Sequence, residues 1–308
     1  MQSDVKQKFT EFMGEVVSKF PQLESGLIDL DTCDQSDLSA ALNAFQYANR
    51  RVLAGLSTRE AQIEAFGRVS FDFIRLQARF MLSGKYAATE NPSHLTELYD
   101  DDSRMNGYYL DGLLVTYMLW PNHARFFRSF LEQFLPIVSK IKDLQIGEIG
   151  VGHGLMATSL IECITNAKFT ALDISSASLE FTKTSFDILN AGANLSCIKF
   201  DAVSEFVPIE LEEKFDAFIC CEVLEHVDNP EKMLQNIFKL LKPGSPVFLT
   251  TVCNMEAEDH IYLFNNPDEI VKMVLDTGFS ISFQEVIGLD GYPNLGPVPL
   301  NYLAILKK

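Results

Sequence analysis

The chain has 308 residues, of which 47 % are apolar, and its formal net charge is −17. This length allows one large domain or two smaller ones with a well-buried core. Nucleic acids and anionic membranes attract proteins mainly through cationic side chains. Because the chain is acidic and has no run of Lys and Arg, we expect it to bind neither of them.

The N-terminal residues mix charged and apolar side chains and lack the continuous apolar stretch of a signal peptide. No apolar run is long enough to cross a bilayer. The six cysteines form no C-x-x-C pair and mostly lie in apolar runs, which is typical of reduced core residues. These features predict a cytoplasmic protein.

Residues 1–140 are predicted to form an all-helical N-terminal region, because apolar residues recur there at three- and four-residue intervals. Ser57 or Thr58 is expected to cap one of these helices. Residues 91–93 interrupt the pattern, and an apolar, aromatic stretch follows at residues 108–120. The expected helices cover residues 5–20, 38–56, 58–82 and 121–135.

Residues 141–308 are predicted to form a second, α/β domain, because short apolar runs alternate there with helical segments. The last two strands are joined by a Gly- and Pro-rich loop that is too short for a crossover helix. They should therefore pair antiparallel, with one of them inserted beside parallel strands. The expected strands are 145–149, 169–172, 196–200, 217–221, 246–252, 280–286 and 300–306. The expected helices are 155–164, 176–190, 231–241 and 267–277.

A glycine-rich turn follows the first expected strand. Glycines at such a turn let the backbone bend sharply and let a ligand approach closely. The dinucleotide pattern G-x-G-x-x-G would need Gly or Ala at position 155, where this chain has Leu155. The pattern is instead acidic-x-Gly-x-Gly-x-Gly, which suits a ligand without a pyrophosphate. It reads Glu148-Ile149-Gly150-Val151-Gly152-His153-Gly154.

Acidic residues end the next two strands. Asp173 lies about 20 residues beyond the loop, where a carboxylate accepts hydrogen bonds from ribose hydroxyls. Asp201, followed by Ala202, could accept from an adenine amino group. Either residue alone is more often an ordinary turn residue. Together with the loop they stand at the carboxyl edge of the sheet, where ligands bind in open α/β folds, so they predict a nucleoside site.

These motifs resemble those of the class I S-adenosylmethionine-dependent methyltransferases over residues 144–308. Phe215-Asp216, Glu222-Val-Leu-Glu-His-Val227 and Leu241-Lys-Pro-Gly244 add to the resemblance. It implies a Rossmann-like, seven-stranded, mostly parallel sheet whose last strand is antiparallel and lies between two others. It also implies S-adenosylmethionine as the cofactor, with the three loop glycines against its methionine and ribose parts, Asp173 at the ribose, Asp201 at the adenine and Glu222 at the methionine end. The expected cofactor-binding residues are Glu148, Gly150, Gly152, Gly154, Asp173, Ile174, Asp201, Ala202, Glu222, Tyr109 and Tyr117.

Methyl transfer from a sulfonium is a direct displacement, so proximity and alignment supply most of the catalysis. A general base helps only where the acceptor carries a proton that must be removed. The aromatic segment before the first strand could line an acceptor pocket or simply belong to the core. The segment after the fifth strand could contact the acceptor or be a structural loop. The candidate catalytic residues are Asn122, His123, His226, His260 and Tyr262.

Glu222, Glu225 and His226 are similar to the metal-binding set of ubiquinone-pathway O-methyltransferases and of small-RNA 2′-O-methyltransferases. His260 could be a fourth ligand, and such a set would suit magnesium or zinc. The same segment shapes the cofactor pocket in many metal-free relatives. We therefore predict no metal from the sequence.

The leading functional hypothesis is a methyltransferase that acts on a small-molecule acceptor and produces S-adenosylhomocysteine. The helical region would cover the site and exclude water. A second hypothesis is based on similarity to azetidine-2-carboxylate synthases, in which the amine of S-adenosylmethionine attacks its own γ-carbon and methylthioadenosine leaves. A third is a non-catalytic S-adenosylmethionine-binding partner subunit. The acceptor and the oligomeric state stay open.

Overall fold

The computed structural model describes residues 2–87, 98–288 and 297–308. The predicted break at 91–93 and most of the loop before the last strand lie outside these ranges. The N-terminal region is helical, as expected, and includes two π-helical segments, η3 and η4. Its elements are α1 (Gln2–Lys19), η1 (Pro21–Gly26), α2 (Gln35–Leu53), α3 (Arg59–Ser83), α5 (Asp102–Arg104), η3 (Met105–Tyr109), α6 (Leu110–Leu119), α7 (Pro121–Ser129), η4 (Phe130–Phe134) and α8 (Leu135–Val138).

Local sequence explains where these helices begin and end. The Thr58 hydroxyl accepts a hydrogen bond from the Ala61 N–H at 3.1 Å, so Thr58 is the cap of α3. Gly84 ends α3 in the left-handed conformation. The predicted helix from 121 onward is interrupted by η4, just before Pro136. Because proline has no N–H to donate, the regular hydrogen-bond ladder cannot continue through it.

The C-terminal region forms one seven-stranded sheet in the order β3-β2-β1-β4-β5-β7-β6. Strand β7 runs antiparallel to both of its neighbours, and the pairs from β3 to β5 are parallel. The fold class predicted from the sequence is confirmed. The strands are β1 (Gln145–Ile149), β2 (Lys168–Asp173), β3 (Leu195–Lys199), β4 (Ala217–Cys221), β5 (Pro246–Cys253), β6 (Ser280–Gly288) and β7 (Leu300–Lys307). The helices are α9 (Leu155–Cys163), α10 (Ser176–Ile188), α11 (Pro230–Leu240) and α12 (Pro267–Thr277), with short 3-10 turns η5 (Gly192–Asn194), η6 (Ile209–Leu211) and η7 (Leu224–His226).

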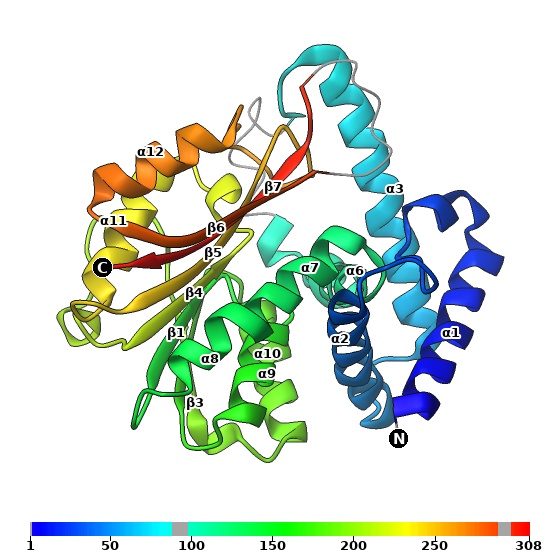
Figure 1. The fold of residues 1–308 in the computed structure, drawn as a ribbon, viewed down its shortest axis with the longest axis horizontal. Coiled ribbons are helices and arrows are strands. Elements are labelled where there is room, and N and C mark those ends of the chain that lie inside the picture. Colours follow the sequence, from blue (N-terminus) through cyan, green and yellow to red (C-terminus); the bar gives the residue numbers. More distant parts are fainter. Residues whose placement is uncertain (1, 88–97, 289–296) are drawn as a thin grey trace.

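Helices cover both faces of the sheet (Figure 1). Helices α11 and α12 bury one face, and α9, α10 and the helices of residues 121–138 bury the other. The second of these apolar layers continues without a break into the N-terminal helices, where Phe9 and Phe45 belong to the same cluster as Phe248 of β5. The helical region therefore packs on the sheet as part of its core. The domain division at 140/141 stays a prediction.

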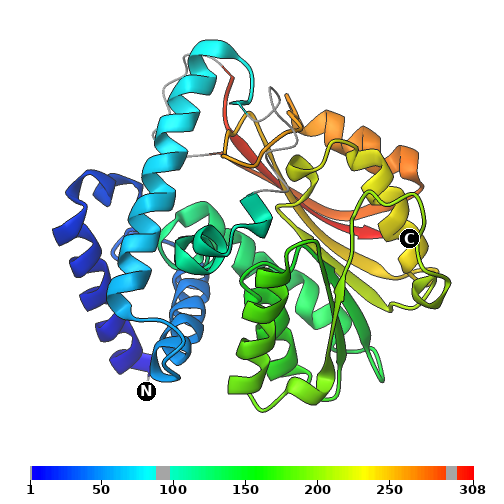
Figure 2. The same cartoon turned by 180° about the vertical axis from the view of Figure 1, so that it is seen from behind.

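The helical region stands beside the sheet. Within it, α3 and α6 lie between the sheet and the outermost helix, α1 (Figures 1 and 2). The side-chain amide of Gln77 on α3 donates to the Asn254 carbonyl at 2.9 Å and accepts from the Glu256 N–H at 2.7 Å. These bonds fix α3 to the loop that follows β5. Within the described ranges, none of the helices has the length and apolar content needed to cross a membrane.

Candidate functional site

A cavity of about 450 Å³ lies at the carboxyl ends of the strands, and its volume falls in the range of small-molecule sites. The glycine loop and the ends of β2, β3 and β4 line one part of it. The remainder of the wall comes from α3, from η3 and α6, and from the loop after β5. The wall residues outside the sheet edge include Val69, Phe73, Leu76, Tyr99, Tyr108, Tyr109, Leu113, Tyr117, Trp120, Met255, Glu258 and Asp259.

The glycine loop opens onto this cavity at Gly150 and Gly152. Gly152 has a φ of +48°, and a Cβ atom added there would meet nothing nearer than the Gly150 carbonyl oxygen at 3.9 Å. Gly154 is not among the residues that line the cavity, and its expected contact with the cofactor stays a prediction. Its φ is +68°, and an added Cβ would lie 2.7 Å from Thr182 Oγ1 of α10. Gly154 is therefore required by the turn into α9 and by the close approach of α10.

Asp173 is buried at the end of β2 and lines the cavity. Its Oδ1 accepts from the Ser175 N–H at 2.8 Å, and its Oδ2 accepts from the Gly152 N–H at 3.3 Å. Burial raises the pKa of this carboxyl to about 6, although these backbone donors act in the opposite direction. The neighbouring wall residues that the sequence predicted are Ile174, Asp201 and Ala202, and all three lie at the cavity.

Two glutamates at the cavity, Glu148 and Glu222, have buried side-chain oxygens without partners among the described residues. Among the described residues, Glu148 Oε2 and Glu222 Oε1 have no hydrogen-bond partner, and both residues line the cavity. Burial raises the pKa of both carboxyls well above the usual range. Buried polar oxygens normally have a donor, so a ligand that brings positive charge or N–H groups would satisfy them. S-adenosylmethionine carries a sulfonium and an ammonium group, so these residues fit that cofactor.

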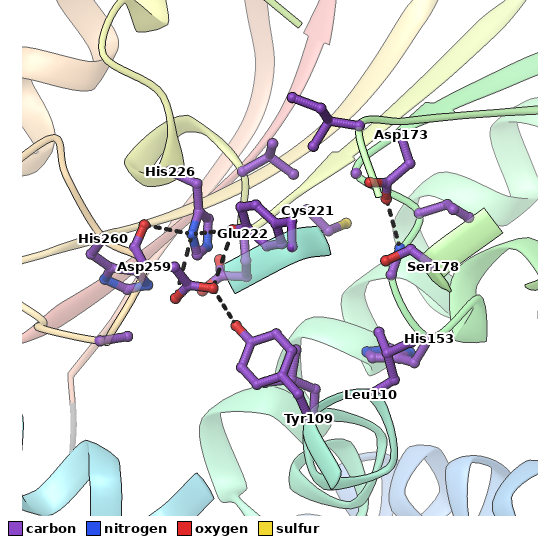
Figure 3. Close-up of a pocket in the computed structure, with 18 of the residues that line it drawn as sticks. Tyr109, Leu110, His153, Asp173, Ser178, Cys221, Glu222, His226, Asp259 and His260 are labelled. Atoms are coloured by element: carbon purple, nitrogen blue, oxygen red, sulfur yellow. Dashed lines mark hydrogen bonds and ion pairs between the residues drawn. The ribbon is translucent and has the colours of Figure 1, made fainter. Parts of the chain in front are cut away.

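On the side of the cavity away from Asp173, Asp259 is the centre of a hydrogen-bonded cluster (Figure 3). Its Oδ2 accepts from the Tyr109 hydroxyl at 2.6 Å and from the Tyr99 hydroxyl at 3.1 Å. Burial opposes ionisation of Asp259, but the nearby His226 and Arg104 hold its pKa below the usual range. His226 Nδ1 lies 3.0 Å from the Asp259 carbonyl oxygen. Because a carbonyl can only accept, Nδ1 donates, and in the neutral ring Nε2 is the nitrogen with the free lone pair.

Three ligand atoms from Glu225, His226 and His260 lie within 4.8 Å of one another. His260 Nδ1 is 2.7 Å from the Met255 carbonyl oxygen, so its Nε2 is also free to accept or to ligate. Glu225 Oε2 accepts from the Thr251 hydroxyl at 2.7 Å, and its Oε1 has no partner in the described part of the chain. Carbonyls that orient ligating histidines in this way are usual around metals. The geometry thus supports a cation more strongly than the sequence did.

Two predicted residues of the helical region line the cavity beside the glycine loop. The Tyr117 ring centroid lies 4.9 Å from that of His123 and 5.0 Å from that of His153. His123 Nδ1 is 2.7 Å from the Thr116 hydroxyl. Burial lowers the pKa of the His123 and His153 imidazoles to about 3, so both rings are neutral near pH 7.

Two predicted catalytic residues do not reach the cavity. Asn122 donates from Nδ2 to Asn301 Oδ1 of β7 at 2.9 Å, so it belongs to the packing of α7 on the sheet. Tyr262 packs on Phe264, with 4.7 Å between ring centroids. Conversely, the sequence did not single out Tyr99 or Arg104, because no motif marks them. Asp259 could have been found from its position next to His260.

A family model described as a methyltransferase domain matches residues 148–247. Ubiquinone biosynthesis O-methyltransferase from Pseudoalteromonas translucida (strain TAC 125) is 30 % identical over 132 residues, which are 43 % of this chain and 53 % of that protein. The mitochondrial enzyme of the same name from Dictyostelium discoideum is 30 % identical over 144 residues, 45 % of this chain and 44 % of the relative. This chain spans about half the length of these curated relatives.

Two solved structures are similar to this chain at lower sequence identity. A SAM dependent methyltransferase from Aquifex aeolicus is 15 % identical in sequence, with a TM-score of 0.43. The superposition covers 70 % of this chain and 98 % of that protein. The [4+2]-cyclase SpnF is 14 % identical in sequence, with a TM-score of 0.48. The superposition covers 61 % of this chain and 82 % of that protein.

The matched domain begins at Glu148, the first residue of the glycine-loop motif, and includes both strand-end aspartates. The resemblance drawn from the sequence is confirmed, and so is S-adenosylmethionine as the cofactor of this fold. Residues 148–247 match a methyltransferase domain, and the motifs and strand order around them are similar to those of the class I S-adenosylmethionine-dependent methyltransferases.

Proposed function

We propose that this chain is an enzyme that methylates a small-molecule acceptor inside the cavity and releases S-adenosylhomocysteine. The observation that carries the proposal is the continuity of the cavity, which joins the cofactor edge of the sheet to a wall built by α3 and α6. When bound, S-adenosylmethionine supplies an electrophilic methyl group on sulfur. Asp173 and Asp201 would orient the nucleoside, and Glu148 and Glu222 would face the positively charged end.

The wall from the helical region would hold the acceptor. Phe73, Leu76 and Trp120 give it an apolar surface that excludes water. In a displacement reaction, such positioning supplies much of the rate enhancement. His226, oriented through Nδ1 by the Asp259 carbonyl, presents Nε2 as a base for an acceptor that loses a proton. This arrangement favours a hydroxyl or amine acceptor.

A specific observation also favours a second role for His226. Glu225, His226 and His260 would hold a divalent cation through one oxygen and two nitrogens. A cation there would polarise an acceptor oxygen and orient it. Because His226 Nε2 cannot ligate a cation and accept a proton at once, the two roles are alternatives. If the cation assists, chelation should abolish turnover and added magnesium or zinc should restore it. Unchanged turnover after chelation would assign His226 as the base.

The proposed activity can be tested without knowing the acceptor. The protein is incubated with S-adenosylmethionine and either the small-metabolite filtrate of a cell extract or the retained macromolecules, and nucleoside products are measured. We expect S-adenosylhomocysteine with the filtrate and none with the macromolecules. Methylthioadenosine formed from S-adenosylmethionine alone would instead support cyclisation to azetidine-2-carboxylate. Binding without either product would favour a non-catalytic partner subunit.

A further inference from the structure

The helical region contacts the cofactor loop as well as the acceptor side of the cavity. The Tyr47 side chain of α2 is 5 % exposed, and its hydroxyl lies 2.7 Å from the His153 carbonyl oxygen. It also lies 2.7 Å from Ser185 Oγ of α10. Because the carbonyl can only accept, the Tyr47 hydroxyl donates to His153. We propose that Tyr47 is a positioning residue that sets the affinity of the glycine loop for the cofactor.

The bond from Tyr47 completes the fixation of one peptide group. The N–H of the His153–Gly154 peptide donates to the Val151 carbonyl at 2.9 Å, and its C=O accepts from Tyr47. Since a peptide is planar, bonds at both ends define its orientation. The residues on both sides of this peptide, Gly152, His153 and Leu155, line the cavity. The orientation of this peptide thus sets the loop surface that meets the ligand.

Arg51, one turn further along α2, keeps Tyr47 in place. Its Nη1 donates to Ser185 Oγ at 2.7 Å, and its guanidinium lies 3.3 Å from the Phe181 ring centroid. Both contacts are on α10, the helix that follows the ribose-side strand β2. Helix α2 is therefore fixed to α10, on the cofactor side of the sheet.

Tyr86 offers a matched comparison within the same region. It is 1 % exposed, and its hydroxyl accepts a hydrogen bond from the Met255 N–H at 3.2 Å. Met255 belongs to the loop after β5, on the acceptor side. Both tyrosines are thus buried residues of the helical region whose hydroxyls bond to a site loop. They differ in which loop they hold.

The test compares Tyr47→Phe with Tyr86→Phe in calorimetric titrations with S-adenosylhomocysteine, with melting temperatures measured on the same samples. We expect Tyr47→Phe to weaken binding about tenfold, because the loop carbonyl loses its donor. Tyr86→Phe should leave the dissociation constant within about twofold. Equal affinity losses in both variants, or none in Tyr47→Phe, would overturn the proposal.

Ser185→Ala separates loop positioning from general packing, because it removes the shared hydroxyl and leaves the Tyr47–His153 bond. We expect Ser185→Ala to lower the melting temperature, and to reduce the affinity for S-adenosylhomocysteine less than Tyr47→Phe does. A loss of affinity as large as that of Tyr47→Phe would assign the effect to helix packing and contradict the proposal. The inference rests on the proposed cofactor but not on methyl transfer. If the unmodified protein did not bind S-adenosylhomocysteine, the proposed function would fail instead.

Discussion

The sheet and the helical region contribute to one cavity in different ways. In the sheet, ligand-facing groups stand where strands end, so the position of Asp173 follows from the order of strands along the chain. In the helical region, side chains reach the cavity through contacts between distant segments. Tyr109, for example, meets Asp259 across 150 residues of sequence. Strand order thus determines the cofactor side of the cavity, whereas tertiary packing determines the acceptor side.

The largest expected effect lies on the cofactor side. Gly152→Val would place a branched side chain in the cavity, and we expect it to abolish S-adenosylhomocysteine binding, a loss of about a hundredfold or more in affinity. Gly84→Val is the matched control, since Gly84 also has a positive φ, of +66°, and no atom within 4 Å of an added Cβ. Both variants should lose about 1–2 kcal/mol of unfolding free energy. Normal binding by a folded Gly152→Val protein would contradict our account of the loop.

Asp173→Ala should have the next largest effect. A buried carboxylate that accepts from ribose hydroxyls is worth roughly 1.5–3 kcal/mol, which corresponds to a loss of about 10- to 150-fold in affinity. Calorimetric titration with S-adenosylhomocysteine measures this loss of affinity. Asp201→Ala removes an exposed carboxylate and should lose less affinity than Asp173→Ala. Unchanged affinity in Asp173→Ala would contradict the prediction that Asp173 binds the ribose.

On the acceptor side, Tyr109→Phe and Asn122→Ala should behave in opposite ways. Tyr109→Phe keeps the ring and removes the bond to Asp259, so we expect turnover to fall about tenfold with little change in melting temperature. Asn122→Ala leaves Asn301 without its partner and should cost about 1–3 kcal/mol of unfolding free energy at near-normal turnover. Reduced turnover in a fully stable Asn122→Ala protein would instead show that Asn122 takes part in the reaction.

The smallest expected effect is on the pH dependence of stability. The pKa of Asp173 is raised to about 6 in the folded protein, so the folded state binds the proton more tightly than the unfolded state does. The free energy of unfolding should therefore fall as the pH rises from about 4 to about 7, by on the order of 1–3 kcal/mol. The contribution of Asp259 to the free energy of unfolding changes with pH in the opposite direction. Because the pKa of Asp259 is lowered, this contribution changes only at more acidic pH. Denaturation of Asp173→Asn should show a flatter pH profile, and an equally steep one would contradict the assignment.

Motif and spacing were sufficient to predict the individual strands, the glycine loop and the position of Asp173, because local backbone rules decide these features. The place of the last strand between two others came from the family resemblance. At Gly154, a left-handed turn and the close approach of Thr182 are a sufficient reason for the glycine, whether or not it contacts the cofactor. At Asn122, the sequence does not show which way the side chain points. Neighbouring helix residues point about 100° apart, so His123 can face the cavity while Asn122 faces β7. No local pattern marks Tyr99 or Arg104, since only the folded chain brings them to Asp259.

The ligand at the carboxyl edge of the sheet decides both the cofactor assignment and the proposed reaction. Calorimetric titration of the unmodified protein with S-adenosylhomocysteine, and separately with NAD, tests this point. We predict one S-adenosylhomocysteine site per chain with a dissociation constant in the range of about 1 μM to 1 mM, and no binding of NAD, because Leu155 stands where the dinucleotide pattern needs a small residue. Binding of NAD, or no binding of S-adenosylhomocysteine by the folded protein, would contradict the account.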